Sequence, residues 1–333
     1  MKHSNIAFFI PHLGCPHMCS FCNQRSISGQ VAPPSPKEVS DSCAQALEAI
    51  SPERRRNTEI AFFGGSFTAI DRGYMLELLQ AAAPYCGADR FAGIRISTRP
   101  DCISEEILSI LREYGVSAIE LGVQSLNDRV LEQNKRGHTV QQVDEAVRLI
   151  RAYGFSLGLQ MMTGLYGDSK ESVYETADRI IDYQPDTVRI YPTVVIKGTE
   201  LCRLYQAGLY HPPGMEETVP LVADLLLRFE QAGIRVIRVG LHPSRELERD
   251  MVAGAYHPAF RELCEGEIYY RILTEKLVER QLHEAEVGVN PRAVSKLVGQ
   301  SGRNLKRLEQ AGYRIKIIRD ENIPVRELVI KEV

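Results

Sequence analysis

Three cysteines lie close together near the start of the chain, at Cys15, Cys19 and Cys22, in a Cys-x3-Cys-x2-Cys spacing. They directly follow a short apolar segment, and a proline after the first cysteine keeps their loop out of regular helix. A structural zinc site uses four protein ligands, and an ordinary iron–sulfur cubane uses four cysteines. Three thiolates therefore leave one corner of a metal centre open for a ligand. A zinc site completed by His12 or His17 is the alternative.

The elements that must position these cysteines alternate between strand and helix. Seven short segments rich in β-branched and aromatic residues are predicted to be strands, and stretches with apolar residues at helical spacing lie between them. This alternation predicts an α/β fold with a parallel sheet, closed or nearly closed into a (β/α) barrel, whose ligands bind at the carboxyl ends of the strands. The predicted strands are Asn5–Ile10, Glu59–Phe63, Phe91–Thr98, Ala118–Val123, Ser156–Met162, Thr187–Tyr191 and Arg235–Val239.

Further motifs lie at or just beyond the ends of these strands. The second strand runs into Gly64, Gly65 and Ser66, where glycine allows a close approach of the backbone to a ligand. A plain turn between strand and helix is the alternative for this segment. The later motifs, in chain order, are Ser97–Asp101, Glu120–Ser125, Asn134–Thr139, Met161–Leu165 and Ile190–Thr193.

Together with the cysteine triplet, these motifs resemble the radical S-adenosylmethionine (SAM) superfamily. In their order they look like the radical domain of the Elongator catalytic subunit family and, more distantly, like oxygen-independent coproporphyrinogen oxidase. The resemblance covers about residues 5–245. It implies a partial or full parallel barrel of the radical SAM type. The cysteine spacing is the compact form of the superfamily, and the acetyltransferase domain of the Elongator family has no counterpart in the sequence, so we do not expect chemistry with acetyl-CoA.

The resemblance also implies cofactors and their ligands. A 4Fe–4S cluster would be held by the three cysteines, and its open iron would chelate the amino and carboxylate groups of SAM. Reduction of the cluster, by a donor such as a ferredoxin or flavodoxin, would cleave SAM to a 5′-deoxyadenosyl radical. Ser97 stands where relatives often have a carboxylate. The residues implied to bind SAM are Gly64, Gly65, Ser66, Ser97, Gln124, Arg136 and Gln160.

The end of the chain carries a different motif. A predicted helix runs into Gly299-Gln-Ser-Gly302, a second helix follows, and strands are predicted at Tyr313–Ile318 and Glu327–Val333. This resembles a KH domain, whose Gly-x-x-Gly loop clamps single-stranded nucleic acid. The glycines allow the backbone to approach phosphates, and three cations flank them. A helical hairpin with a glycine turn is the alternative. The predicted nucleic-acid contacts are Gly299, Gly302, Arg303, Lys306 and Arg307.

Composition fits this two-part organisation. Of the 333 residues, 44% are hydrophobic and 25% are charged, which is typical of a globular protein with a sizeable core. The formal net charge is −3, whereas residues 285–333 carry ten basic and six acidic side chains, so any polyanion site is expected there. We predict a barrel over residues 1–245, a helical connector over 246–284 and a KH-like domain over 285–333. No membrane span or signal-like segment is evident, and a cytoplasmic location is expected.

The sequence therefore favours a radical SAM enzyme that acts as an RNA-modifying transferase. Its substrate is expected to be RNA, and most simply tRNA. Two alternatives stay open. One is a radical SAM oxidoreductase acting on a small molecule, as in the coproporphyrinogen oxidase relatives. The other is an RNA-binding protein in which the metal centre is structural or senses the redox state.

Overall fold

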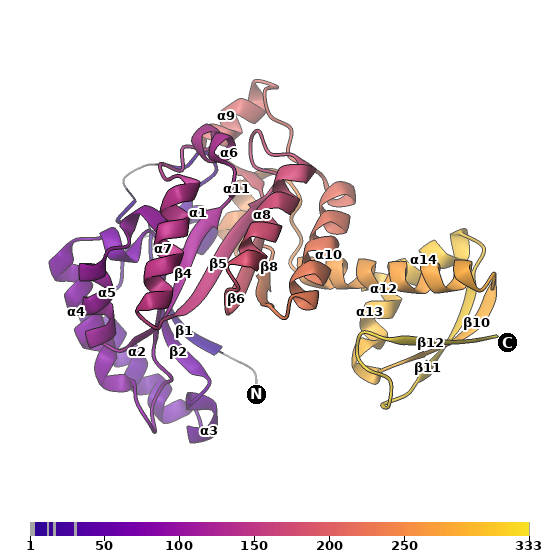
Figure 1. The fold of residues 1–333 in the computed structure, drawn as a ribbon, viewed down its shortest axis with the longest axis horizontal. Coiled ribbons are helices and arrows are strands. Elements are labelled where there is room, and N and C mark those ends of the chain that lie inside the picture. The colour runs from indigo at the N-terminus through magenta and orange to yellow at the C-terminus, as the bar shows by residue number, and fades with distance from the viewer. Residues whose placement is uncertain (1–3, 12, 16–17, 30–31, 333) are drawn as a thin grey trace.

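The fold is described from a computed structural model, which covers residues 4–11, 13–15, 18–29 and 32–332. Its main feature is a parallel sheet with the strand order β1-β2-β3-β4-β5-β6-β8, which curls into a half-barrel (Figure 1). All seven predicted strands are confirmed. They are β1 (Ser4–Ile10), β2 (Thr58–Gly64), β3 (Ile94–Thr98), β4 (Val116–Gln124), β5 (Ser156–Thr163), β6 (Thr187–Pro192) and β8 (Arg235–Val239).

Helices cover the outer, convex face of this sheet (Figure 1). Several begin at side-chain caps that the sequence encodes. Ser35 and Glu38 form a capping box at the start of α2, and Thr139 and Gln142 form one at the start of α7. The helices of this region are α1 (Gln24–Ser28), α2 (Pro36–Ala49), α3 (Pro52–Arg55), α4 (Arg72–Ala82), α5 (Glu105–Glu113), α6 (Asp128–Gln133), α7 (Val140–Ala152), α8 (Lys170–Asp182), α9 (Glu200–Gln206), α10 (Met215–Gln231) and α11 (Arg245–Asp250), with short 3-10 turns η1 (Phe67–Ala69), η2 (Ala83–Tyr85) and η3 (Pro100–Cys102).

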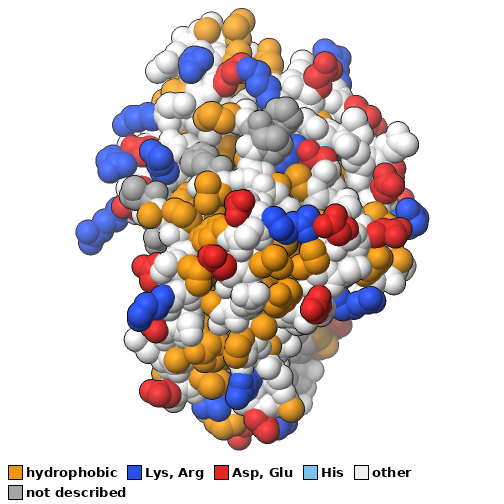
Figure 2. Space-filling view, turned by 90° about the vertical axis from the view of Figure 1, so that its left-hand side faces the viewer, with side chains coloured by type: hydrophobic (Ala, Val, Ile, Leu, Met, Phe, Trp, Pro, Cys, Tyr) orange, Lys and Arg blue, Asp and Glu red, His pale blue; other side chains and the backbone are white. Residues whose placement is uncertain are grey.

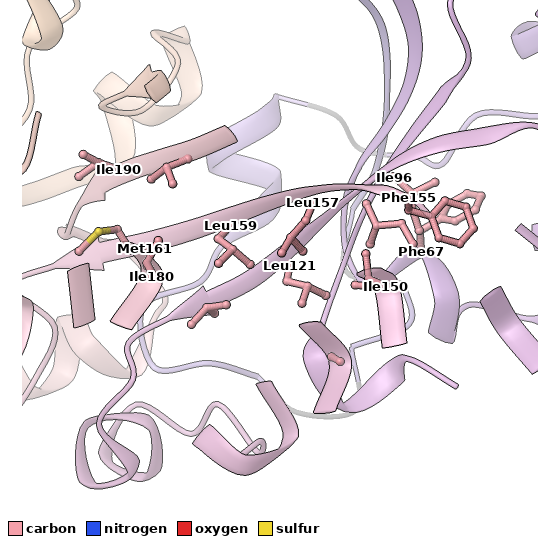
Figure 3. Close-up of a cluster of buried hydrophobic side chains, with 14 of the residues drawn as sticks. Phe67, Ile96, Leu121, Ile150, Phe155, Leu157, Leu159, Met161, Ile180 and Ile190 are labelled. Carbon is pink, nitrogen blue, oxygen red and sulfur yellow. The ribbon is translucent and has the colours of Figure 1, made fainter. Parts of the chain in front are cut away.

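The main hydrophobic core lies between the sheet and these helices. Figure 3 shows Leu121, Leu157 and Leu159 of the central strands beside Ile150 of α7 and Ile180 of α8. On the face of the molecule away from the carboxyl-terminal unit, acidic and basic side chains are interspersed around apolar ones (Figure 2). None of the helices in the described part of the chain combines the length and the apolar character that crossing a bilayer requires.

A long helix, α12 (Phe260–Glu279), joins the half-barrel to a smaller unit (Figure 1). Its first half packs into the main core through Phe260 and Ile268, and its second half packs into a separate core through Leu273 and Leu277. The predicted connector is therefore shared between the two cores. The smaller unit contains β10 (Glu284–Val289), η4 (Pro291–Ala293), α13 (Val294–Val298), η5 (Gln300–Gly302), α14 (Arg303–Gln310), β11 (Arg314–Arg319) and β12 (Leu328–Glu332).

Three strands were not among the sequence predictions. The strand β10 is the centre of the small sheet, where it pairs in parallel with β11 and antiparallel with β12. A short antiparallel pair, β7 (Val194–Ile196) and β9 (Met251–Gly254), lies beyond the carboxyl end of β6. The strands β7 and β9 extend the wall of the half-barrel past the end of the main sheet.

Candidate cofactor site

The cysteine loop leaves the carboxyl end of β1, as the sequence predicted. Cys19 is buried, whereas Cys15 and Cys22 are partly exposed. The segment that follows α6 fixes this loop, because Asn134 accepts hydrogen bonds from the backbone N–H and the hydroxyl of Ser20, at 3.0 and 2.8 Å. The loop is thus attached to a buried residue of the half-barrel. His12 and His17, the possible zinc ligands, lie outside the described residues.

The surroundings of the cysteines suit thiolates that are bound to a cationic centre. Burial raises the pKa of Cys22 to about 12, and the neighbouring thiolates act in the same direction, so the bare site disfavours the charged form. Burial also raises the pKa of Cys15, against the opposing charges of Arg99 and Arg136. Arg136 Nη1 donates to Cys19 Sγ at 3.0 Å. Arg99 and Arg136 supply positive charge, and Arg136 supplies a hydrogen bond to sulfur, which iron–sulfur sites use to tune the cluster.

Within the described part of the chain, no three His, Cys, Asp or Glu side chains converge on a single ion. His12 and His17 are not among those residues. A feature at the end of β4 fits a bound cofactor. Gln124, which lies in the left-handed region at φ 69° and ends β4, has a buried Oε1 without a hydrogen-bond partner in the described structure. An orphaned buried acceptor of this kind is satisfied when a donor from a ligand reaches it.

The Gly64-Gly65 turn joins the end of β2 to the cysteine loop. The N–H of Gly65 donates to the carbonyl of Ile10 at 2.8 Å, and the N–H of Ser66 donates to that of Leu13 at 3.0 Å. Gly64 adopts φ 107°, which favours glycine. A Cβ on Gly65 would lie 1.9 Å from the oxygen of Leu13. The turn therefore requires glycine mainly because the segment before the cysteines packs directly against it.

We expect Gly65→Ala to destabilise the protein by about 3 kcal/mol and to lower the iron content of the reconstituted protein, because the new Cβ displaces the backbone that leads to Cys15. Gly214→Ala is the matched control, since no described residue beyond its chain neighbours has an atom within 4 Å of its Cβ position and its φ is −78°. Urea unfolding and iron analysis measure the two effects. Equal iron content in the two variants would show that the turn does not hold the cysteine loop.

A cavity of about 660 Å³ opens on the concave side of the sheet, next to the cysteine loop. This volume lies within the usual range for small-molecule sites. Cys22, Gly64, Ser97, Gln124 and Gln160 line it together, so the structure brings these sequence-predicted residues to one place.

Two of the predicted residues are engaged elsewhere. Ser66 is completely buried, and its hydroxyl bonds to that of Thr98 at 2.8 Å, so it links the turn to the end of β3. Arg136 holds the thiol of Cys19 and the carbonyl of Gly122, and its Nε is buried without a partner in the described structure. Arg136 therefore contacts the cluster loop directly. Its predicted contact with the carboxylate or ribose of SAM stays a prediction.

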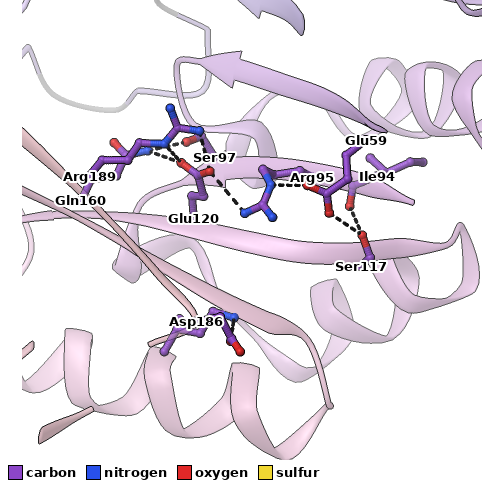
Figure 4. Close-up of polar contacts among 10 residues, drawn as sticks. Glu59, Ile94, Arg95, Ser97, Ser117, Glu120, Gln160, Asp186 and Arg189 are labelled. Carbon is purple, nitrogen blue, oxygen red and sulfur yellow. Dashed lines mark hydrogen bonds and ion pairs between the residues drawn. The ribbon is translucent and has the colours of Figure 1, made fainter. Parts of the chain in front are cut away.

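A chain of buried charges crosses the sheet beneath the cavity, and the sequence analysis did not include it (Figure 4). Glu120, which is 1% exposed, accepts from Arg189 Nε at 2.6 Å and Arg189 Nη2 at 2.8 Å. It also forms an ion pair with Arg95 at 3.3 Å, and Arg95 continues to Glu59 at 2.6 Å. Although burial opposes it, the Glu120 carboxylate raises the pKa of Arg189. The signal was present in the sequence, since each charge interrupts an otherwise apolar strand.

This network also positions a predicted cofactor residue. Gln160 Nε2 donates to Ser97 Oγ and to Glu120 Oε2, each at 2.9 Å. The side-chain amide group is thereby fixed in one orientation at the wall of the cavity. Arg189 packs over the ring of Phe63, 5.1 Å from its centroid, and both residues line the cavity. The charges below the cavity, on the same concave face of the sheet, thus determine which polar atoms the cavity presents.

In the smaller unit, the Gly-x-x-Gly segment joins α13 to α14, with β10 before and β11 after this pair of helices. Gly299 and Gly302 have φ of 73° and 72°. Asn304, which is buried, donates to the carbonyls of Gly266 and Leu297 at 2.8 and 3.1 Å. The Asn304 side chain also lies 2.9 Å from the Cβ position of Gly299, whereas the Cβ position of Gly302 is open. The first glycine is therefore packed against α12, and the second is accessible.

The three predicted cations beside this segment differ in their surroundings. Arg307 forms an ion pair with Glu267 at 2.6 Å and lies over the ring of Tyr270. Arg303 is 3.4 Å from Glu216 in an exposed pair. Lys306 is exposed. Much of the Arg307 charge is therefore neutralised within the protein, which leaves Lys306 and Arg303 as the side chains most available to a phosphate.

Known proteins resemble this chain in both sequence and fold. The family model described as the Radical SAM superfamily matches residues 9–180, and the Radical SAM C-terminal domain matches residues 185–270. An uncharacterised protein of Methanocaldococcus jannaschii is 31% identical over 223 residues, which cover 64% of this chain and 68% of that protein.

Two further relatives match smaller shares of this chain. The tRNA uridine(34) acetyltransferase of M. jannaschii is 34% identical over 40% of this chain and 25% of that protein. Human Elongator complex protein 3 is 35% identical over 52% of this chain and 31% of that protein. The matches thus span between a quarter and a third of the length of these relatives.

Among solved structures, Elp3 of Methanocaldococcus infernus aligns with a TM-score of 0.62 at 22% identity, covering 84% of this chain and 63% of that chain. Streptococcus suis SuiB bound to S-adenosylmethionine aligns with a TM-score of 0.51 at 14% identity, over 74% of this chain and 52% of that chain. These likenesses show the fold. A 4Fe–4S cluster and SAM are the cofactors of the matched family, and the cysteine loop, the glycine turn and the unsatisfied Gln124 suit them. The chain, matched by the family model over just over half its length, belongs to the radical SAM superfamily.

Proposed function

We propose that this radical SAM enzyme modifies RNA and that its substrate is a tRNA. One observation carries the proposal. The same chain contains a cavity lined by predicted SAM contacts and a Gly-x-x-Gly unit, and helix α12 packs into the cores of both parts. The relatives named as a tRNA uridine(34) acetyltransferase and as Elongator complex protein 3 support tRNA as the substrate class. The electron donor we propose is a ferredoxin or flavodoxin.

The residues of the chain divide the work between the two units. The cluster and SAM, when bound, supply a carbon-centred radical. Cys15, Cys19 and Cys22 hold the cluster, and Gln124 and Gln160 orient SAM in the cavity that they line. In the smaller unit, Gly302 leaves room for a phosphate, and Lys306 and Arg303 provide positive charge beside it. The KH-like unit would hold the RNA while the target nucleotide enters the cavity.

The test measures 5′-deoxyadenosine release by anaerobically reconstituted protein with dithionite and SAM, with and without bulk tRNA. We expect tRNA to increase the release. A double variant, Arg303→Ala with Lys306→Ala, should reduce this stimulation and lower the slope of log affinity against log salt by about 1.4, because two phosphate contacts to a single strand are lost. Arg314→Ala with Lys316→Ala removes the same charge from the exposed sheet of the unit and is the control.

Each contrary result has a defined meaning. Release that ignores tRNA would favour a small-molecule substrate, as in the coproporphyrinogen oxidase relatives. A complete absence of release from protein with an intact cluster would favour a structural or redox-sensing cluster. If both double variants lose affinity for tRNA equally, the smaller unit attracts RNA through its overall charge, and the Gly-x-x-Gly segment is not the binding site.

A further inference from the structure

Two arginines lie side by side on the concave face of the half-barrel. Arg189 of β6 and Arg238 of β8 are direct partners in the register of these parallel strands. Both line the 660 Å³ cavity. Like charges placed directly opposite each other on neighbouring strands are destabilising unless other groups compensate them. The pairing therefore requires a source of negative charge for each arginine.

Among the described residues, a carboxylate pairs with Arg189 and none pairs with Arg238. Arg189 forms a bidentate pair with Glu120, which lies beneath the cavity. Arg238 donates from Nε to the carbonyl of Gly240 at 2.9 Å, and no carboxylate of the described residues forms an ion pair with it. Burial lowers the pKa of Arg238, and the charge of Arg189 acts in the same direction. The outer nitrogens of the Arg238 guanidinium group are thus left for a ligand.

The lining of the cavity has no compensating acid either. Among the described residues that line it, none is Asp or Glu. Aromatic side chains, including Phe9, Phe63 and Tyr191, make up part of the wall. A half-buried, unpaired guanidinium group beside aromatic rings is suited to a ligand that combines a flat ring with an oxyanion, because arginine binds carboxylate and phosphate with two parallel hydrogen bonds.

Arg238 lines the same cavity as the predicted cofactor contacts but comes from a different strand of the sheet. Gly64, Ser97, Gln124 and Gln160 lie on β2 to β5, close to the cysteine loop that follows β1. Arg238 lies on β8, the last strand of the sheet. We propose that Arg238 binds an oxyanion of the substrate and so fixes the position of the substrate over the cavity. The identification of that oxyanion as a nucleotide phosphate rests on the RNA substrate proposed above.

The test compares the binding of uridine 5′-monophosphate and uridine to reconstituted, SAM-saturated protein by anaerobic calorimetry. We expect the wild type to bind the nucleotide at least about tenfold more tightly than the nucleoside, as a charge-assisted contact allows. Arg238→Met should abolish this difference, and Arg238→Lys should restore part of it. Arg235→Met, at the exposed start of the same strand, is the matched control. Circular dichroism and the thermal midpoint verify that each variant is folded.

The affinity for SAM alone distinguishes the two possible sources of the oxyanion. If Arg238→Met leaves that affinity unchanged while it removes the preference for the nucleotide, the oxyanion belongs to the substrate. A tenfold loss of SAM affinity in Arg238→Met would assign Arg238 to the carboxylate of SAM and overturn the proposal. Equal binding of nucleotide and nucleoside by the wild type would also overturn it, even where tRNA stimulates release. A failure of tRNA stimulation, in contrast, contradicts the RNA function alone.

Discussion

Replacing Cys19 by alanine is expected to abolish SAM cleavage, with 5′-deoxyadenosine release falling by about a hundredfold or more. The loss of an outer partner of a metal ligand already costs about 10–100-fold in affinity or activity, and this change removes a ligand itself. Cys19 is also the thiol that Arg136 contacts at 3.0 Å, so the variant leaves that buried guanidinium without one of its acceptors. Iron and sulfide analysis, together with release under dithionite, measure the effect.

Cys43→Ala is the matched control for Cys19→Ala. Cys43 is buried like Cys19, but it lies in α2 within the main core, away from the cysteine loop. Burial raises its pKa to about 12, which is typical of an inert core thiol. The Cys43 variant should lose some stability and retain its iron. Wild-type iron content and release in Cys19→Ala would remove Cys19 from the set of cluster ligands.

The parts of the fold that were predictable share a local origin. Each main strand is a run of apolar residues bounded by turn signals, and each long helix has its own apolar periodicity, so both can be identified without knowing their neighbours. The start of α2 was also encoded locally, by Ser35, Pro36 and Glu38. The strand β10 was missed although Glu284 and Glu286 alternate with buried Ala285 and Val287. This pattern is short and weak in hydrophobicity, and it lies beside a more conspicuous glycine motif.

The candidate site was predictable only where the motif was continuous. Cys15, Cys19 and Cys22 are neighbours in sequence, and the glycine turn directly follows a strand. In contrast, the partners of Arg303 and Arg307 are Glu216 and Glu267 on α10 and α12, which a sequence pattern does not bring together. Their engagement follows from the way in which the smaller unit packs against these helices.

The buried network around Glu120 is the clearest case of this kind, because its members come from β2, β3, β4, β5 and β6. In parallel strands the register fixes which side chains meet. Glu120 is the register partner of Ser97 and of Gly158, and the absence of a side chain on Gly158 leaves space that the stem of Glu120 occupies. A Cβ on Gly158 would lie 2.8 Å from Glu120 Cγ. The carboxylate therefore lies where only a folded sheet can surround it with arginines.

Glu120→Gln is expected to lower the free energy of unfolding by about 3 kcal/mol, because removal of one partner leaves the charges of Arg95 and Arg189 inadequately paired inside the protein. Glu284→Gln is the control, since its pair with Arg314 is exposed and should contribute less than about 1 kcal/mol. Urea unfolding followed by circular dichroism compares the two variants. A similar loss in both would show that burial adds nothing to the strength of the Glu120 network.

The same substitution should also weaken SAM binding in the protein that remains folded. Glu120 Oε2 accepts from Gln160 and from Arg189, so a glutamine at position 120, which can place an amide N–H there, releases both side chains from their fixed orientations. Arg189 would then compete with Arg238 for the ligand oxyanion. In Glu120→Gln we therefore expect the affinity for SAM to fall and the preference for nucleotide over nucleoside to persist. In Arg238→Met we expect the affinity for SAM to persist and the preference for the nucleotide to be lost. Calorimetry on both variants checks this reciprocal result. If either variant loses both the affinity for SAM and the preference for the nucleotide, the cavity is not divided into a cofactor side and a substrate side.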